Sequence, residues 1–168
     1  GRLAAQKNQR LLLDVARVLV DRGLDVHLLV AGAGELEDEL RAETRRRNLE
    51  GHVTFTGFER DVPGFLRTLD VFLLSSLWEG FGNVILEAGA ARLPTVALDL
   101  SSNPETVVDG TTGFLVPPDD VQAFADRVAL LAEDEDLRAR MGAAARARVE
   151  ERFRFSRTMD ELERFLDV

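Results

Sequence analysis

Residues 71–90, VFLLSSLWEGFGNVILEAGA, contain an apolar run of strand length, a glycine-rich loop and a helix-period segment in direct succession. The run over residues 71–75 predicts a buried β-strand. Residues 84–91 predict a helix, and Asn83 stands directly before it as a preferred N-cap residue. A strand that leads through glycines into a helix is typical of parallel sheets covered by helices.

The same alternation extends over residues 1–118. Strands are expected over residues 24–31, 53–55, 71–75, 95–98 and 113–116, and helices over residues 9–22, 36–48, 62–69 and 84–91. The pattern predicts an α/β fold, a doubly wound parallel sheet of Rossmann-like type. After Pro117-Pro118 only helices are expected, over residues 119–168. We therefore predict a single domain over residues 1–168.

Composition excludes several classes of function. A chain of 168 residues that is 45% apolar fits one folded core, and its net charge of −9 argues against a nucleic-acid partner. There is no cysteine and there are only two histidines, so we expect no metal site. No apolar run reaches the roughly 18 residues that a membrane helix needs, and we expect a cytoplasmic protein. Because residue 1 is Gly rather than Met, we expect a piece of a longer polypeptide.

The loop after the strand at residues 71–75 can hold a ligand, because ligands of parallel sheets bind outside the carboxyl ends of the strands. Glycines let the backbone approach a ligand closely, and the start of the next helix offers N–H groups to a phosphate. Glu79 and Glu87 then place two carboxylates at one pocket, where they can accept hydrogen bonds from vicinal sugar hydroxyls. The alternative is that Glu87 only complements the helix dipole and Glu79 is solvated. Trp78 is interpreted as a loop anchor rather than a stacking platform.

Residues 79–88 resemble the E-x7-E signature of glycosyltransferase family 4 (glycosyl transferases group 1), E-G-F-G-x-x-x-x-E-A. Members of that family are retaining enzymes with the GT-B fold, and this chain resembles their C-terminal, donor-binding half. The resemblance implies that Glu87 binds the ribose hydroxyls of the nucleotide and that Glu79 contacts hydroxyls of the transferred sugar. It also implies donor contacts by the turn between them, which comprises Gly80, Phe81, Gly82 and Asn83.

A second family element, G-R-x-x-x-x-K, matches residues 1–7. Its lysine position is taken by Lys7, the only lysine among 21 basic residues. The resemblance implies that Arg2 and Lys7 neutralise the diphosphate and help it depart, which makes them catalytic together with Glu79. The alternative is a frayed N-terminus that carries two solvated cations.

Weaker matches cover about 150 residues in all, and V-x-F-x-G at residues 53–57 is one of them. The loop that follows contacts the base in the family, which implies base contacts by Phe58 and Glu59. Two departures stand out. Residues 99–103, DLSSN, replace a loop that contains paired glycines. The family also places a central strand immediately before G-R, and a chain that begins at Gly1 lacks it.

The resemblance implies a donor domain that binds a UDP-, GDP- or ADP-linked sugar and needs no metal or other cofactor. The acceptor, which is a sugar, a lipid or a small molecule, is expected to bind an N-terminal domain outside this chain. The parent protein is expected to be able to associate peripherally with a membrane, and the fragment alone to be inactive. Two alternatives stay open: a non-catalytic nucleotide-sugar-binding module, and a dinucleotide-binding domain built on Gly32-Ala33-Gly34. The second signal is weak because Glu37 takes the place of the third glycine.

Overall fold

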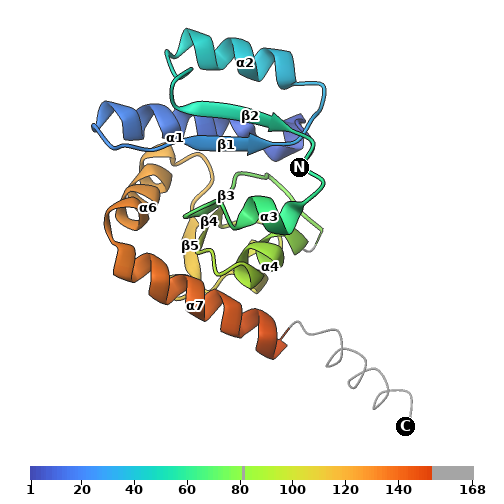
Figure 1. Ribbon diagram of the computed structural model, residues 1–168, viewed down its shortest axis with the longest axis vertical. Helices are drawn as coiled ribbons and strands as arrows, with labels where there is room; N and C mark the ends of the chain where they lie inside the picture. Colours follow the sequence, from blue (N-terminus) through green and yellow to red (C-terminus); the bar gives the residue numbers. More distant parts are fainter. Residues whose placement is uncertain (81, 153–168) are drawn as a thin grey trace.

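The computed structural model describes residues 1–80 and 82–152 (Figure 1). Its strands are β1 (Leu28–Ala31), β2 (Val53–Gly57), β3 (Phe72–Leu74), β4 (Thr95–Leu98) and β5 (Gly113–Val116). Its helices are the 3-10 turn η1 (Ala5–Lys7), α1 (Gln9–Asp21), α2 (Glu37–Arg46), α3 (Val62–Leu66), α4 (Asn83–Ala90), α5 (Asn103–Thr106), α6 (Val121–Glu133) and α7 (Glu135–Arg152). The predicted α/β alternation is therefore confirmed.

Three differences from the prediction concern the start of β1 and two short helical segments, and α3 also ends earlier than predicted, at Leu66. β1 begins at Leu28 rather than at residue 24, because β2 begins at Val53 and the parallel register pairs Leu28 with Val53. Among the described residues, no neighbouring strand is available to pair with those before Leu28. The turn η1 and the helix α5 were not predicted, because segments of three and four residues are too short to show a hydrophobic period.

The described strands form two parallel sheets, β1-β2 and β3-β4-β5, rather than one continuous sheet. Among the described residues no strand lies between β1 and β3 to join them. The segment before α1 passes between their carboxyl ends instead. The Gly1 amino group donates to the Ala31 carbonyl at 2.6 Å, and the Leu77 amide donates to the Gln6 carbonyl at 2.9 Å. Figure 1 shows the N-terminus beside the end of β1.

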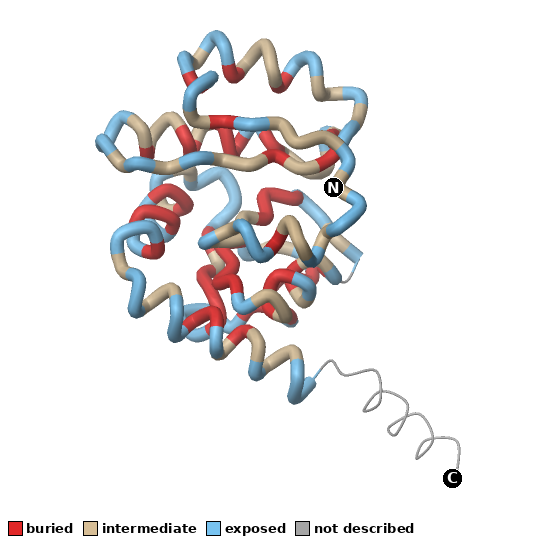
Figure 2. The backbone as a smooth tube through the Cα atoms, in the orientation of Figure 1, coloured by how far each residue is buried: buried red, intermediate tan, exposed pale blue. Residues whose placement is uncertain are grey.

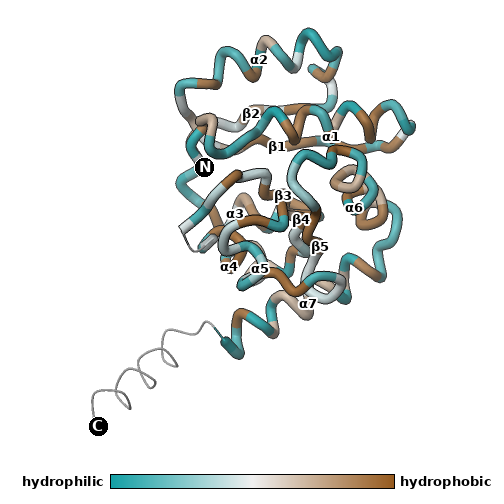
Figure 3. The backbone as a smooth tube through the Cα atoms, turned by 180° about the vertical axis from the view of Figure 1, so that it is seen from behind, coloured by the Kyte–Doolittle hydropathy of each residue, from teal (hydrophilic) through white to brown (hydrophobic). Residues whose placement is uncertain are grey.

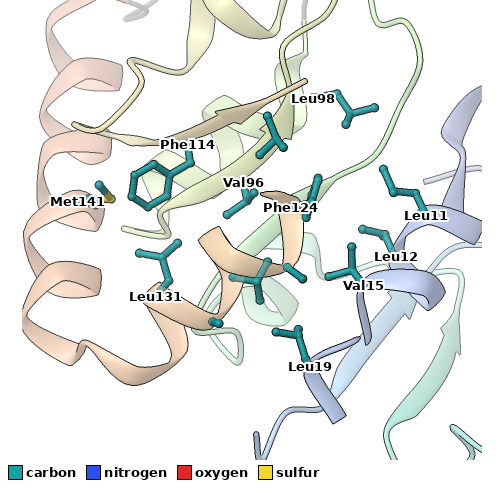
Figure 4. Close-up of a cluster of buried hydrophobic side chains, with 14 residues drawn as sticks. Leu11, Leu12, Val15, Leu19, Val96, Leu98, Phe114, Phe124, Leu131 and Met141 are labelled. Atoms are coloured by element: carbon teal, nitrogen blue, oxygen red, sulfur yellow. The ribbon is translucent and has the colours of Figure 1, made fainter. Parts of the chain in front are cut away.

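Helix α1 connects the two sheets by packing on both sides. Its residues Leu12, Val15 and Leu19 join a core formed with α6, β4 and β5 (Figure 4). On another face, Leu13 and Ala16 join a core formed with β1, β2 and α2. Full burial of one such side chain stabilises the fold by about 1.5–3 kcal/mol, so α1 holds the sheets together without strand hydrogen bonds. Figure 2 shows the buried residues of this interior, and Figure 3 shows that the residues of α2 are mainly hydrophilic.

Of the two C-terminal helices, α6 packs on α1 and α7 packs on α4. The Asp120 carboxylate accepts from the Ala123 amide at 2.8 Å and caps α6. Helix α7 packs closely on the end of α4, where a β-carbon added to Gly142 would lie 2.1 Å from the Arg92 carbonyl oxygen. This contact leaves the opposite face of α4 exposed. Residues 153–168, the last part of the predicted helical region, lie outside the described residues.

Candidate functional site

The turn η1 and the loop after β3 bring together two predicted site residues that are 72 positions apart. The Lys7 ammonium donates to Glu79 Oε1 at 2.5 Å. The Ser75 hydroxyl donates to the Lys7 carbonyl at 2.7 Å, and the Gln6 amide group donates to the Trp78 carbonyl at 2.7 Å. These contacts attach η1 to the end of β3, so the position of Lys7 is set by the backbone as well as by its ion pair.

The Glu79 carboxylate is held in its ionised form. Its side chain is 14% exposed and that of Lys7 is 26% exposed, so water screens this pair less than it screens a surface pair. Burial raises the pKa of Glu79, but the hydrogen bonds from Lys7 and from the Ser76 hydroxyl lower it by more than burial raises it. The net pKa of Glu79 therefore lies below its ordinary value. An ionised carboxylate only accepts hydrogen bonds. Glu79 is therefore suited to receive the hydroxyl groups of a ligand.

Helix α4 begins shortly after Glu79 in the chain, and its first backbone N–H groups have no side-chain cap. Gly82 is the N-cap residue at φ 64°, Asn83 is the first helical residue, and no described side chain caps the helix. The prediction that Asn83 is the N-cap is therefore wrong, because the chain enters the helix through a left-handed turn that glycine adopts without strain. Uncapped N–H groups at a helix start form a site for a negative group such as a phosphate.

One face of α4 points to solvent. Asn83 and Glu87 are exposed, whereas Ile85, Ala88 and Gly89 are buried. Residues four positions apart lie on the same side of a helix, so the Glu87 carboxylate stands one turn, roughly 6 Å along the axis, beyond the helix start. In the described part of the chain no ion pair or hydrogen bond engages the Glu87 side chain. It is thus available to a ligand.

The remaining predicted residues are mostly exposed to solvent. The Arg2 side chain is 75% exposed and forms an ion pair with Glu35 at 3.5 Å, so the structure does not bring it to Glu79. Phe58 is exposed directly after β2, and Glu59 is half-buried. Gly80 is exposed, with open space where a side chain would stand. Phe81 lies outside the described residues.

Trp78 does not anchor its loop. Its side chain is 61% exposed, so the interpretation of Trp78 as a loop anchor is wrong. The loop is held through backbone groups instead, because Gln6 binds the Trp78 carbonyl. Sequence reasoning did not find Gln6 or Ser75, because contacts between residues so far apart leave no local pattern.

Sequence reasoning also missed Ser101. This residue lies between β4 and α5 at φ 54°, and its hydroxyl donates to the Glu79 carbonyl at 2.8 Å. The same hydroxyl accepts from the Glu79 amide at 3.3 Å. The available signal was the serine that stands in the loop where the family has paired glycines.

Gly32 and Gly34 have a steric explanation. A β-carbon on Gly32 would lie 1.5 Å from the Gly1 carbonyl oxygen, and one on Gly34 would lie 2.3 Å from the Leu3 carbonyl oxygen. The two glycines therefore let the N-terminal segment cross the end of β1 closely. This crossing accounts for the G-x-G pattern without a dinucleotide.

Residues 1–80 and 82–152 contain no group of three or more His, Cys, Asp or Glu residues that could hold a metal ion. None of the helices in the same part of the chain combines the length and the apolar character needed to span a membrane.

Comparison with known proteins identifies the family. The model of the family described as glycosyl transferases group 1 matches residues 1–148. The chain belongs to this family. As a group 1 glycosyltransferase chain it is 32% identical over 164 residues to the capsular polysaccharide biosynthesis glycosyltransferase CapM of Staphylococcus aureus, with 97% of the chain and 43% of CapM covered.

Two more proteins resemble this group 1 chain. It is 34% identical over 164 residues to the alpha-D-kanosaminyltransferase of Streptomyces kanamyceticus, with 96% of the chain and 42% of that protein covered. Its fold matches the crystal structure of Anabaena HepE in complex with UDP with a TM-score of 0.91 and 28% identity, covering 99% of the chain and 47% of HepE. The fold is therefore a Rossmann-like half of the GT-B type, and the chain spans less than half the length of each protein.

Proposed function

We propose that this chain is the donor-binding, C-terminal domain of a family 4 glycosyltransferase, which takes a nucleoside diphosphate sugar and transfers the glycosyl group with retention of configuration. The observation that carries the proposal is the partly buried ion pair of Lys7 and Glu79, with Glu79 three residues ahead of Gly82 at the uncapped start of α4 in the chain. Support comes from the glycosyltransferase names of the relatives and from HepE, which was crystallised with UDP and with UDP-glucose.

In this proposal the cations and the helix start bind the diphosphate. The Lys7 ammonium and the N–H groups of α4 stabilise the negative charge that develops on the leaving nucleoside diphosphate. Arg2 joins them by exchanging Glu35 for a phosphate oxygen. That exchange costs little, because an exposed ion pair such as Arg2–Glu35 contributes only about 0.2–1 kcal/mol.

The acidic residues bind the two sugars of the donor. Glu79 accepts hydrogen bonds from hydroxyls of the transferred sugar, and Glu87 accepts them from the ribose. The exposed ring of Phe58 stacks on the base, with Glu59 beside it, and the open space at Gly80 leaves the loop backbone accessible to the sugar. This arrangement requires neither a metal ion nor another cofactor.

The domain arrangement is part of the proposal. The chain covers 43% of CapM and 42% of the kanosaminyltransferase, so a second domain that binds the acceptor accounts for the remaining length. A strand ahead of Gly1 would lie between β1 and β3, because Gly1 binds the end of β1 while Gln6 binds the loop after β3. Such a strand would join the two sheets into one doubly wound sheet.

Nucleotide binding tests the proposal directly. Calorimetric titration of UDP, GDP and ADP compares the wild-type protein with Glu87→Gln, and Glu133→Gln serves as the control because Glu133 is an exposed helical glutamate on α6. A hydrogen bond to a charged acceptor is worth about 1.5–3 kcal/mol, so Glu87→Gln should weaken the preferred nucleotide by about 10- to 100-fold. Equal affinities of the two variants would contradict the ribose assignment.

Transfer is tested in the full polypeptide as its gene encodes it. Release of sugar from the preferred donor is followed with Glu79→Ala as the variant, and the anomeric configuration of the product is determined by proton NMR. We expect Glu79→Ala to lose sugar release and the product to retain the donor configuration. A protein that binds nucleoside diphosphates but transfers to no acceptor would be the non-catalytic binding module instead.

A further inference from the structure

Ser101 holds the backbone of Glu79 at both of its polar groups. Its hydroxyl donates to the Glu79 carbonyl at 2.8 Å and accepts from the Glu79 amide at 3.3 Å. A single side-chain oxygen thus satisfies the donor and the acceptor of one loop residue. Without it, both groups face water in an exposed loop that forms no regular backbone ladder.

The loop that carries Ser101 is itself attached to the sheet. The Asp99 amide donates to the Val116 carbonyl of β5 at 2.7 Å. The Asn103 side chain is buried and donates to the Leu98 carbonyl of β4 at 2.9 Å. The hydroxyl therefore transmits the position of β4 and β5 to the loop after β3.

Ser101 keeps this contact in a strained backbone conformation. Its φ of 54° lies in the left-handed region, where a β-carbon is disfavoured and glycine is free of strain. A glycine at this position would keep the turn but would have no hydroxyl to bind Glu79. Serine at this position therefore carries backbone strain, and its hydroxyl makes a contact with Glu79 that glycine could not make.

We propose that Ser101 is a positioning residue for the sugar end of the donor site. Glu79 is held at two places, its carboxylate by Lys7 and its backbone by Ser101, so that the carboxylate meets the sugar hydroxyls in one fixed geometry. This inference rests on the proposed function, in which Glu79 receives those hydroxyls. A fixed acceptor discriminates between sugars that differ in one hydroxyl, because the wrong sugar leaves the carboxylate without its partner.

Two substitutions separate the hydroxyl from the backbone strain. Ser101→Ala keeps the β-carbon and removes the hydroxyl, and Ser101→Gly removes both. Arg92→Gly is the matched control, because Arg92 is exposed, has φ 62° and lies on the opposite end of α4. The measurements use the full polypeptide as its gene encodes it. They comprise thermal unfolding, kcat, KM, the affinity for the nucleoside diphosphate, and the ratio of kcat/KM for two epimeric sugar donors.

We expect Arg92→Gly to keep or raise the melting temperature because it relieves left-handed strain, and Ser101→Gly to change it little because the loss of two hydrogen bonds offsets the same relief. Only the Ser101 variants should lose kcat, by about 10- to 100-fold, since a displacement of about 1 Å near the reacting groups has an effect of this size. They should also lose discrimination between the epimeric donors, while their affinity for the nucleoside diphosphate stays within about twofold of wild type, a change of well under 1 kcal/mol.

A carbon NMR titration of the Glu79 carboxyl gives a readout that needs no turnover. In the wild type its pKa lies below the ordinary value, and release of the loop in Ser101→Ala should move it toward that value as the contact with Lys7 loosens. A Ser101→Gly or Ser101→Ala protein with wild-type kcat and epimer discrimination overturns the inference while the proposed function stands. Wild-type turnover in Glu79→Ala overturns the proposed function itself.

Discussion

Replacing Lys7 by methionine removes the ammonium from the ion pair but keeps most of the side-chain volume. The remaining Glu79 carboxylate is 14% exposed and retains the Ser76 hydroxyl as a partner. Breaking an exposed pair costs about 0.2–1 kcal/mol and breaking a buried one about 3–5 kcal/mol. Because this pair is partly buried, we expect Lys7→Met to lower the free energy of unfolding at pH 7 by about 1–3 kcal/mol.

The loss should depend on pH in a defined direction. In the folded protein the pKa of Glu79 lies below its unfolded value, so the contribution of the pair is fully present above the unfolded pKa. It is lost as the pH falls through the folded pKa, because the carboxyl group is then protonated in both states. The difference between wild type and Lys7→Met should therefore shrink toward zero in acid.

Urea unfolding at pH 7 and at a series of lower pH values measures this difference, and a double-mutant cycle with Glu79→Gln isolates the pair. Arg10→Met is the matched control, because Arg10 pairs with Glu39 while the two side chains are 52% and 45% exposed. That variant should lose less than about 1 kcal/mol. A Lys7→Met effect no larger than the control, or one that persists unchanged in acid, would refute the reasoning.

Two further predictions concern packing and hydrogen bonding. Gly142→Ala should lower the melting temperature although alanine favours helices by about 1 kcal/mol, because the new β-carbon would meet the Arg92 carbonyl at 2.1 Å; Gly51→Ala, which has open space, should change it little. Calorimetric unfolding checks both variants, and a stabilised Gly142→Ala would contradict the packing. Ser75→Ala should cost about 1 kcal/mol in urea unfolding because it removes a hydrogen bond, whereas Ser102→Ala should be neutral or stabilising because the buried Ser102 hydroxyl has no partner among the described residues. Equal losses in the two serine variants would contradict this assignment.

Much of the fold follows from local pattern. The strands β4 and β5 can be recognised in the sequence as continuous apolar runs, because both faces of each strand are mostly buried. The start of β1 was misplaced because a strand begins where its neighbour begins. The neighbour of Leu28 is Val53, which lies 25 positions away in the sequence and leaves no local signal near residue 28. The N-cap of α4 was misplaced because Asn83 is a better cap by residue type, while Gly82 is the better residue for the left-handed turn.

In the candidate site, too, the sequence predicted the residues but not their contacts. Glu79, Glu87 and Lys7 were predicted from motif spacing, and the structure places Lys7 on Glu79. It directs Arg2 toward Glu35 instead, because the exposed guanidinium pairs with the acidic group nearest the end of β1. No local pattern predicted these partners, since each contact joins two loops that the sheet brings together.

The sequence by itself determined the alternation of strands and helices and indicated the family and the acidic and basic residues of the candidate site. Hydrophobic period and glycine placement are local properties, so they can be read along the chain. Only the tertiary structure decided that Lys7 and Glu79 form one ion pair and that Ser101 holds the Glu79 backbone. These contacts depend on the tertiary structure because parallel strands end at one edge of a sheet, where loops distant in sequence meet and their polar groups must find partners.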